Sequence, residues 1–114
     1  MLSFAKSSKQ KGDEFESKAL SFLQDRGFVL VDRNFNTRFG EIDLIVKKDD
    51  ILHFVEVKGG SGFEPILNLT PNKLQKIIKA VNIYLSKKRF LGEFVIDAII
   101  IKDEKIEFLE NITM

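Results

Sequence analysis

The sequence predicts an α/β fold built from a sheet and two helices. Residues 11–26 and 71–89 place apolar side chains at helical spacing, whereas the other apolar runs are short and rich in strand-forming residues. The predicted strands cover residues 28–32, 41–47, 51–58, 93–101 and 105–109. The elements therefore follow the order α, β, β, β, α, β, β, with no internal repeat.

Length and composition indicate one globular domain. The chain has 114 residues, of which 44% are hydrophobic and 31% charged, a balance typical of a folded protein. We expect a single domain over residues 1–114, with residues 1–10 as a flexible N-terminal segment. No apolar stretch has the length of a signal peptide or a membrane span, so a cytoplasmic protein without a membrane partner is expected.

The cysteine and histidine content restricts the chemistry. The chain has no cysteine and a single histidine, His53, which we expect to face the core or to be partly buried. Disulfides are excluded, and a zinc site of the usual His and Cys type is not expected. Any metal should be a hard cation bound by oxygen atoms. The formal net charge of +1 leaves the partner open and allows only local basic patches.

The helix ends carry recognisable signals. Acidic residues lie in the first turn of the first helix, and Gly27 is its expected C-terminal stop. Thr70 supplies an N-cap and Pro71 a first-turn proline for the second helix. Residues 34–38 are predicted to be a polar connection into the hairpin, and residues 59–62, with three glycines, a flexible loop after it.

The central feature is an expected hairpin that carries acids inside its strands. With the turn centred on residues 49–50, paired positions sum to 99. The pairs that contain acids are Asp43 with Glu56 and Glu41 with Lys58, and all four side chains lie on one face. The opposite, core-facing set is Ile42, Leu44, Val46, His53, Val55 and Val57.

Two facing carboxylates repel each other unless a cation lies between them. At about 5 Å and an effective dielectric near 20, two unit charges repel by roughly 3 kcal/mol. Mg²⁺ or Mn²⁺ between the two carboxylates would turn the net repulsion into a net attraction. The candidate ligands are Asp43, Glu56 and the Val57 carbonyl. Lys58 shares their face, where it can position or deprotonate a water and stabilise charge on a phosphate. This arrangement suits phosphodiester hydrolysis.

Further candidates lie outside the hairpin. Glu16 lies one step off the apolar stripe of the first helix and could reach over the sheet to the metal. Arg38 and Asn34 are either structural hydrogen-bonders or substrate contacts, and Phe39 or Phe63 could stack on bases. Side chains of the second helix that could contact phosphate are Lys73, Gln75, Lys76 and Lys79.

Each candidate also has an ordinary structural interpretation. The hairpin charges could be solvated at a sheet edge, with Lys58 paired to Glu41, and Glu16 could be an exposed helical acid. The lysines of the second helix could simply form its solvated face. Asp97 lies in an apolar run and needs a partner, for which we expect Arg38 or a lysine rather than a catalytic role.

Residues spread along most of the chain form a pattern that can be compared with known families. They are Gly12, Glu16, Ala19, Asn34, Arg38, the segments 40–45 (Gly-Glu-Ile-Asp-Leu-Ile), 54–58 (Phe-Val-Glu-Val-Lys) and 69–71 (Leu-Thr-Pro), Lys73, Tyr84 and Asp97. From about Gly12 to Ile101 the chain resembles the bacterial YraN-type family.

That family is regarded as a small member of the PD-(D/E)XK nuclease superfamily, similar to archaeal Holliday junction resolvases. The resemblance implies a restriction-endonuclease-like αβββαβ core with a mixed central sheet flanked by helices. It also implies that Asp43, Glu56 and Lys58 match the metal and catalytic positions, and that Glu16 matches an acid of the first helix. Glu41 is an additional acid of unknown role.

The leading hypothesis is a Mg²⁺- or Mn²⁺-dependent endonuclease-like protein that acts on DNA, with branched or structured DNA as substrate and a homodimer as assembly. The alternative is a non-catalytic nucleic-acid-binding or assembly module that retains the nuclease fold. A third hypothesis is a protein-interaction domain without nucleic-acid affinity. Metal binding and metal-dependent cleavage separate the first hypothesis from the other two.

Overall fold

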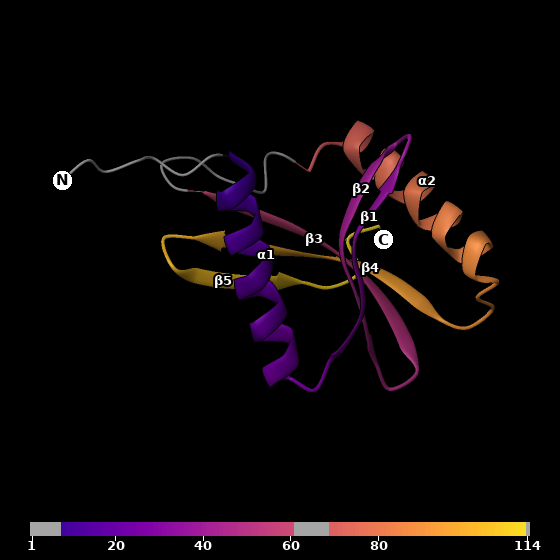
Figure 1. The fold of residues 1–114 in the computed structure, drawn as a ribbon, viewed down its shortest axis with the longest axis horizontal. Coiled ribbons are helices and arrows are strands. Elements are labelled where there is room, and N and C mark those ends of the chain that lie inside the picture. Colours follow the sequence, from indigo (N-terminus) through magenta and orange to yellow (C-terminus); the bar gives the residue numbers. More distant parts are fainter. Residues whose placement is uncertain (1–7, 61–68, 114) are drawn as a thin grey trace.

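The computed structural model describes residues 8–60 and 69–113, which form two helices and five strands. The elements are α1 (Ser8–Asp25), β1 (Val29–Thr37), β2 (Gly40–Lys48), β3 (Ile51–Gly60), α2 (Pro71–Lys88), β4 (Phe94–Lys102) and β5 (Lys105–Leu109). This mixed α/β fold is compatible with the predicted restriction-endonuclease-like core (Figure 1). Neither helix of these ranges is long and apolar enough to cross a membrane.

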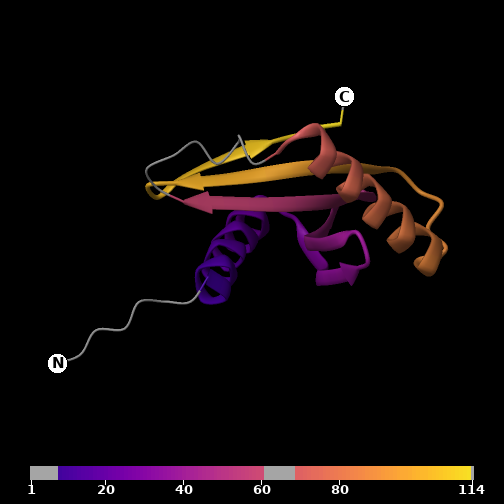
Figure 2. The ribbon, with the colours of Figure 1, turned by 90° about the horizontal axis from the view of Figure 1, so that it is seen from above.

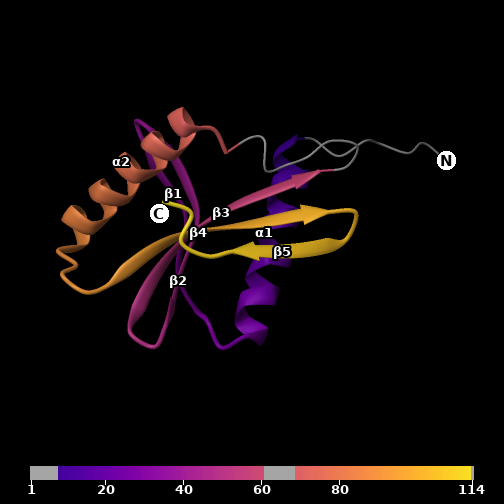
Figure 3. The same cartoon turned by 180° about the vertical axis from the view of Figure 1, so that it is seen from behind.

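The strands form one sheet in the order β1-β2-β3-β4-β5. Neighbouring strands are antiparallel except β3 and β4, which are parallel and are connected through α2. The helices pack on opposite faces, and Figure 2 shows α1 on one side of β3 and β4. In the reverse view, β3, β4 and β5 pass in front of α1 (Figure 3). The core therefore has two layers, one on each face of the sheet.

α1 confirms the first predicted helix and begins three residues earlier than expected, at Ser8. The rest of the expected flexible N-terminal segment lies outside the described residues. Ala19 and Leu23 are fully buried in the layer that α1 forms with the sheet. Gly27 has a φ of 89°, a backbone conformation that favours glycine, and its N–H donates to the Gln24 carbonyl over 3.0 Å. The predicted stop signal thus ends the helix.

α2 begins as its sequence predicts. The Thr70 hydroxyl accepts a hydrogen bond from the Lys73 N–H over 3.3 Å, and Pro71 is the first helical residue. At the other end Arg89 adopts the left-handed conformation and its N–H returns to the last turn of the helix. The buried residues of α2 are Ile77, Ala80, Val81 and Tyr84, which pack on Ile45, Leu52, Phe54 and Ile96 of the sheet.

The prediction of a polar connection over residues 34–38 is wrong, because β1 continues to Thr37. The turn into β2 is formed by Arg38 and Phe39. The Thr37 hydroxyl stabilises it by donating to the Gly40 carbonyl over 2.8 Å and accepting from the Phe39 N–H over 3.0 Å. Polar residues are compatible with an edge strand, since water can solvate the outward side chains; polarity alone therefore does not end a strand.

The predicted register of the β2–β3 hairpin is confirmed near the turn and ends sooner than expected. Pairs summing to 99 extend from Lys48–Ile51 to Leu44–Val55, and the recorded pairing goes no further. In Figure 1 the far end of β2 turns away from β3 together with β1. The expected pairs of Asp43 with Glu56 and Glu41 with Lys58 are therefore not part of the ladder.

The alternation of faces along β2 is also broken at this point. Ile42 and Ile45 both pack in the layer of α2, whereas Leu44 and Val46 pack in the layer of α1. The prediction that Ile42 shares a face with Leu44 is therefore wrong. A strict period of two holds only while the strand keeps its neighbour and its twist, and β2 leaves β3 between Asp43 and Leu44.

β3 is longer than predicted, because Gly59 and Gly60 belong to the strand rather than to the expected loop. Ser61 and Gly62 lie outside the described residues. A Cβ atom at Gly59 would lie 2.5 Å from the ring of Phe15, so α1 approaches β3 too closely for a side chain there. β4 and β5 lie within a residue of their predicted bounds.

Candidate metal and phosphate site

Three carboxylates from two elements converge on the α1 side of the sheet. Glu16 comes from α1, and Glu41 and Asp43 come from the diverging end of β2. One carboxylate oxygen of each lies within 4.8 Å of the other two. Oxygen donors at this spacing suit a hard divalent cation. Glu16 is buried, with 9% of its surface exposed, so the interpretation of this residue as an exposed helical acid is wrong.

Asn34 of β1 connects two of these carboxylates. Its Nδ2 donates to Oε1 of Glu16 and to Oε1 of Glu41, both over 2.8 Å. The Arg33 guanidinium lies 3.6 Å from the same oxygen of Glu16. Of the two roles left open for Asn34, the structure shows the hydrogen-bonding one. The sequence analysis does not identify Arg33, for which the only signal is its position next to Asn34.

The side chain of Asp43 makes a hydrogen bond to β3 at a point where the backbones of β2 and β3 no longer pair. Its Oδ2 accepts the Val57 N–H over 2.8 Å, beyond the point where the ladder ends. Burial is the main cause that raises the pKa of Asp43 from 3.8 to about 6. The Val57 N–H and Lys58 lower this pKa, whereas the charges of Glu16 and Glu41 raise it. A carboxyl group in this setting gains most from a nearby cation.

Glu56 is a buried acid with an uncompensated oxygen. It is 6% exposed, and its Oε1 has no hydrogen-bond partner among the described residues. Burial raises the pKa of Glu56 well above its usual range, and the charge of Asp43 raises it further, while Lys58 and the Asp43 backbone N–H act in the opposite direction. Buried carboxyl groups in proteins normally have a partner, so this one is suited to bind a ligand.

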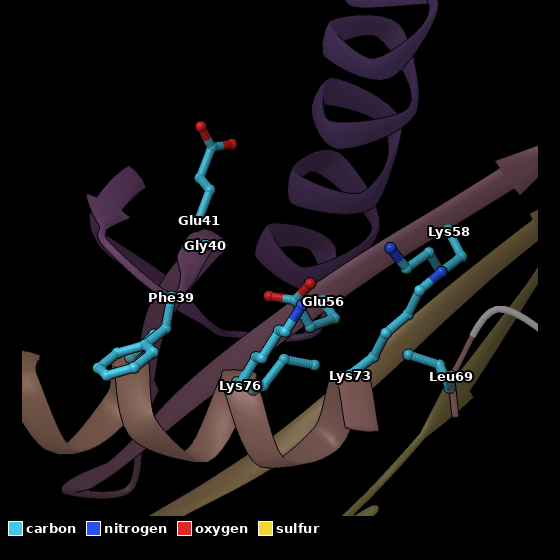
Figure 4. Close-up of a pocket in the computed structure, with 10 residues that line it drawn as sticks. Phe39, Gly40, Glu41, Glu56, Lys58, Leu69, Lys73 and Lys76 are labelled. Atoms are coloured by element: carbon cyan, nitrogen blue, oxygen red, sulfur yellow. The ribbon is translucent and has the colours of Figure 1, made fainter. Parts of the chain in front are cut away.

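A cavity of about 140 Å³ opens beside Glu56 on the α2 side. Its polar lining combines Glu56 and Glu41 with Lys58, Lys73 and Lys76. Figure 4 shows Lys73 and Lys76 extending from α2 toward Glu56 and Lys58. Acidic and basic groups thus share one hollow, as a site for a phosphate and a cation requires.

The predicted metal ligands are only partly assembled into one group. The carboxylates of Asp43 and Glu16 belong to the group whose oxygens lie within 4.8 Å of one another. The third member of this group is Glu41 and not the predicted Glu56. The Val57 carbonyl faces the same gap as Asp43, because the N–H and C=O of one strand residue point to the same side. Within the described residues no ion pair joins Glu41 to Lys58, so the solvated-pair interpretation fails.

The predicted phosphate contacts fall into two sets. Lys73 and Lys76 line the cavity, whereas Gln75 is exposed and does not. Lys79 and Arg38 flank Phe39, with their charged ends 5.1 Å and 4.9 Å from its ring centroid. Phe39 lines the same cavity. Phe63, the other aromatic side chain considered for base stacking, lies outside the described residues.

Asp97 does not pair with Arg38 or a lysine, and that prediction is wrong. Asp97 is fully buried and its Oδ2 lies 2.6 Å from Nδ1 of His53. Its other oxygen accepts the Asn111 N–H over 2.8 Å. His53, which is partly buried as predicted, also packs edge-to-face against Phe28. The partner was missed because His53 and Asp97 meet only through the parallel pairing of β3 with β4.

The fold and the carboxylate group define an α/β domain compatible with a restriction-endonuclease-like core that carries a candidate divalent-metal site. The model of the Uncharacterised protein family UPF0102 matches residues 15–101, and the chain belongs to this family. This confirms the predicted YraN-type family.

Similar proteins from other bacteria support the assignment. A UPF0102 protein of Wolinella succinogenes is 50% identical over 107 residues, covering 94% of this chain and 99% of its own. A UPF0102 protein of Helicobacter pylori is 50% identical over 105 residues and 92% of each chain. One from Helicobacter hepaticus is 46% identical over 107 residues, 94% of this chain and 97% of its own.

Proposed function

We propose that this protein is a divalent-metal-dependent endonuclease-like protein that acts on DNA. The observation that carries the proposal is the buried carboxyl of Glu56, whose Oε1 has no partner among the described residues, beside a cavity lined by lysines. Mg²⁺ or Mn²⁺ fits this donor set because every candidate ligand atom is an oxygen. The residues that would hold it are Asp43, Glu16 and Glu56, with the Val57 carbonyl.

A bound Mg²⁺ or Mn²⁺ would supply Lewis acidity and an activated water. The protein itself supplies the positioning. Lys58 can orient the attacking water or accept its proton, and it can stabilise the negative charge that develops on the phosphate. Lys73 and Lys76 can hold the phosphate backbone as point charges without reading bases. Hydrolysis then joins the water oxygen to phosphorus and releases one ester oxygen of the strand.

Arg38, Lys79 and Gln75 extend the proposed contact surface beyond the cavity. Arg38 and Lys79 bring two positive charges to the tip of the β1–β2 turn, next to Phe39. Branched or structured DNA as substrate, a homodimer as assembly and the cytoplasm as location are part of the same proposal. The resemblance to the YraN-type family, which is similar to resolvases, supports the substrate and the assembly, whereas the location is the expectation drawn from the sequence.

The test is cleavage of a panel of branched, nicked and single-stranded DNA by the purified protein with Mg²⁺ or Mn²⁺. Asp43→Asn should abolish cleavage, and Lys58→Ala should lower its rate by about 10²–10⁴-fold. Glu107→Gln, an exposed acid of β5, is the matched control and should cleave normally. Cleavage that survives Asp43→Asn would refute the site. Metal-independent DNA binding without cleavage would instead support the non-catalytic module.

A further inference from the structure

Glu41 is the acid of this site that the family pattern leaves without a role. It lies two residues before Asp43, in the part of β2 that has left β3. Its carboxylate lies within 4.8 Å of those of Glu16 and Asp43, although its side chain is exposed and free to turn away into water. Three carboxylates this close repel one another when they are charged, because each charge raises the electrostatic energy of the others.

Asn34 holds this arrangement in place. Each of its two amide hydrogens satisfies one Oε1, one on Glu16 and one on Glu41. One oxygen of each glutamate therefore remains available to a ligand. Asn34 has a φ of 54°, a left-handed backbone conformation that asparagine tolerates better than most residues. The backbone of β1 thus departs from the extended conformation at the residue that binds both carboxylates.

A second observation points to a ligand at this group. Glu56, 6% exposed, has an oxygen with no partner in the described part of the chain, and it lines the cavity that Glu41 also lines. The charge of Asp43, a member of the group, acts on Glu56. Figure 4 shows Glu41 extended away from Lys73 and Lys76, so the lysines gather at Glu56 rather than at Glu41. Glu41 and the two lysines of α2 thus line the same cavity with their charged ends apart.

We propose that Glu41 is a direct ligand of the divalent cation, together with Glu16 and Asp43, and that Asn34 is the positioning residue of this ligand set. The inference rests on the function proposed above. It adds Glu41 to the ligands proposed above and places the cation between α1 and the diverging end of β2. Water and phosphate would approach through the cavity that Glu41, Glu56 and Lys58 line. The ligand chemistry is that of a hard cation of the Mg²⁺ or Mn²⁺ class.

The test is a calorimetric titration of the full chain with Mn²⁺, repeated by the Mn²⁺ electron paramagnetic resonance signal. Glu41→Gln should weaken binding by at least about tenfold, and Asn34→Ala should weaken it by about tenfold through loss of positioning. Asp13→Asn, an exposed acid that lines a hollow with Glu16 and Glu41, is the matched control for charge and should bind as the wild type does. Thermal melting of each variant checks that it is folded.

The outcomes distinguish this inference from the proposed function. If Glu41→Gln binds Mn²⁺ as tightly as the wild type while Asp43→Asn does not bind, Glu41 is not a ligand and the nuclease proposal stands. If Asp13→Asn weakens binding as much as Glu41→Gln, the effect is one of overall charge and the inference is overturned. If the wild type binds no Mn²⁺, both proposals are overturned.

Discussion

Replacing Asp43 by asparagine should raise the stability of the metal-free protein at neutral pH. Asp43 is ionised above about pH 6, where it lies in a buried setting beside the charges of Glu16 and Glu41. Asparagine has nearly the same shape, and its Oδ1 can still accept the Val57 N–H that Asp43 binds over 2.8 Å. The substitution therefore removes the unfavourable charge and retains the hydrogen bond.

The magnitude follows from the raised pKa of Asp43. Its value of about 6 exceeds its ordinary value of 3.8, so the folded state binds more protons than the unfolded state between these two values. The contribution of protonated Asp43 to the free energy of unfolding is fully present below pH 3.8 and is lost as the pH rises through about 6. Each pKa unit corresponds to about 1.4 kcal/mol, which sets an upper limit of about 3 kcal/mol. Water at this half-buried group reduces the expected effect to about 1–2 kcal/mol.

The assay is urea denaturation with EDTA at several values between about pH 4 and pH 7, compared for wild type, Asp43→Asn and the control Glu107→Gln. The stability difference between Asp43→Asn and wild type should grow with pH in favour of the variant. Adding Mn²⁺ should reverse the order, because only the wild type gains binding energy. A difference that is the same at every pH would show that Asp43 is not destabilised by ionisation.

Three further predictions concern other parts of the molecule. Thr70→Ala should destabilise the protein by about 1 kcal/mol in urea denaturation, because it removes the N-cap of α2. Asp97→Ala should cost about 2 kcal/mol or more, since it leaves His53 and a backbone N–H without their buried partner, and it should leave Mn²⁺ affinity unchanged in calorimetry. Lys73→Ala combined with Lys76→Ala should weaken DNA binding and lower the slope of log affinity against log salt by about 2.

Each of these three has a distinct contrary result. Thr70→Ser should retain stability, so an equal loss in Thr70→Ser and Thr70→Ala would argue against the cap. Loss of Mn²⁺ binding in a folded Asp97→Ala protein would connect the buried pair to the metal site. An unchanged salt slope in the double lysine variant, or the same change in a Lys105→Ala control on β5, would exclude α2 as the phosphate contact.

The parts of this structure that depend on local interactions were predictable. The N-cap of α2, the stop at Gly27 and the pairs near the β2–β3 turn are set by residues close together in the chain. Asp43 and Glu56 are predictable as site residues because burying an acid in an apolar strand costs free energy unless the acid has a partner. Lys58 follows because it shares their face in the predicted hairpin. Family membership was also recognisable from the pattern along the chain.

The details of the site were not predictable from the same reasoning. The polarity of residues 34–38 predicts a connection and does not indicate the role of Asn34, whereas in the structure β1 brings Asn34 to Glu16 and Glu41. The grouping of Glu41 with Glu16 depends on where β2 leaves β3, and a period of two cannot indicate such a break. The pairing of His53 with Asp97 required the register of two parallel strands.

The sequence by itself determined the number and kind of elements, the family and the acids on which any metal chemistry would depend, because helix and strand periodicity and the cost of burying charge act over short stretches of chain. Only the tertiary structure decided which acids meet. Contacts between α1, β1 and β2 join residues distant in the sequence, and β2 packs against both helices, one on each face of the sheet, near the point where it leaves β3. Such contacts depend on the whole core, so no local pattern specifies them.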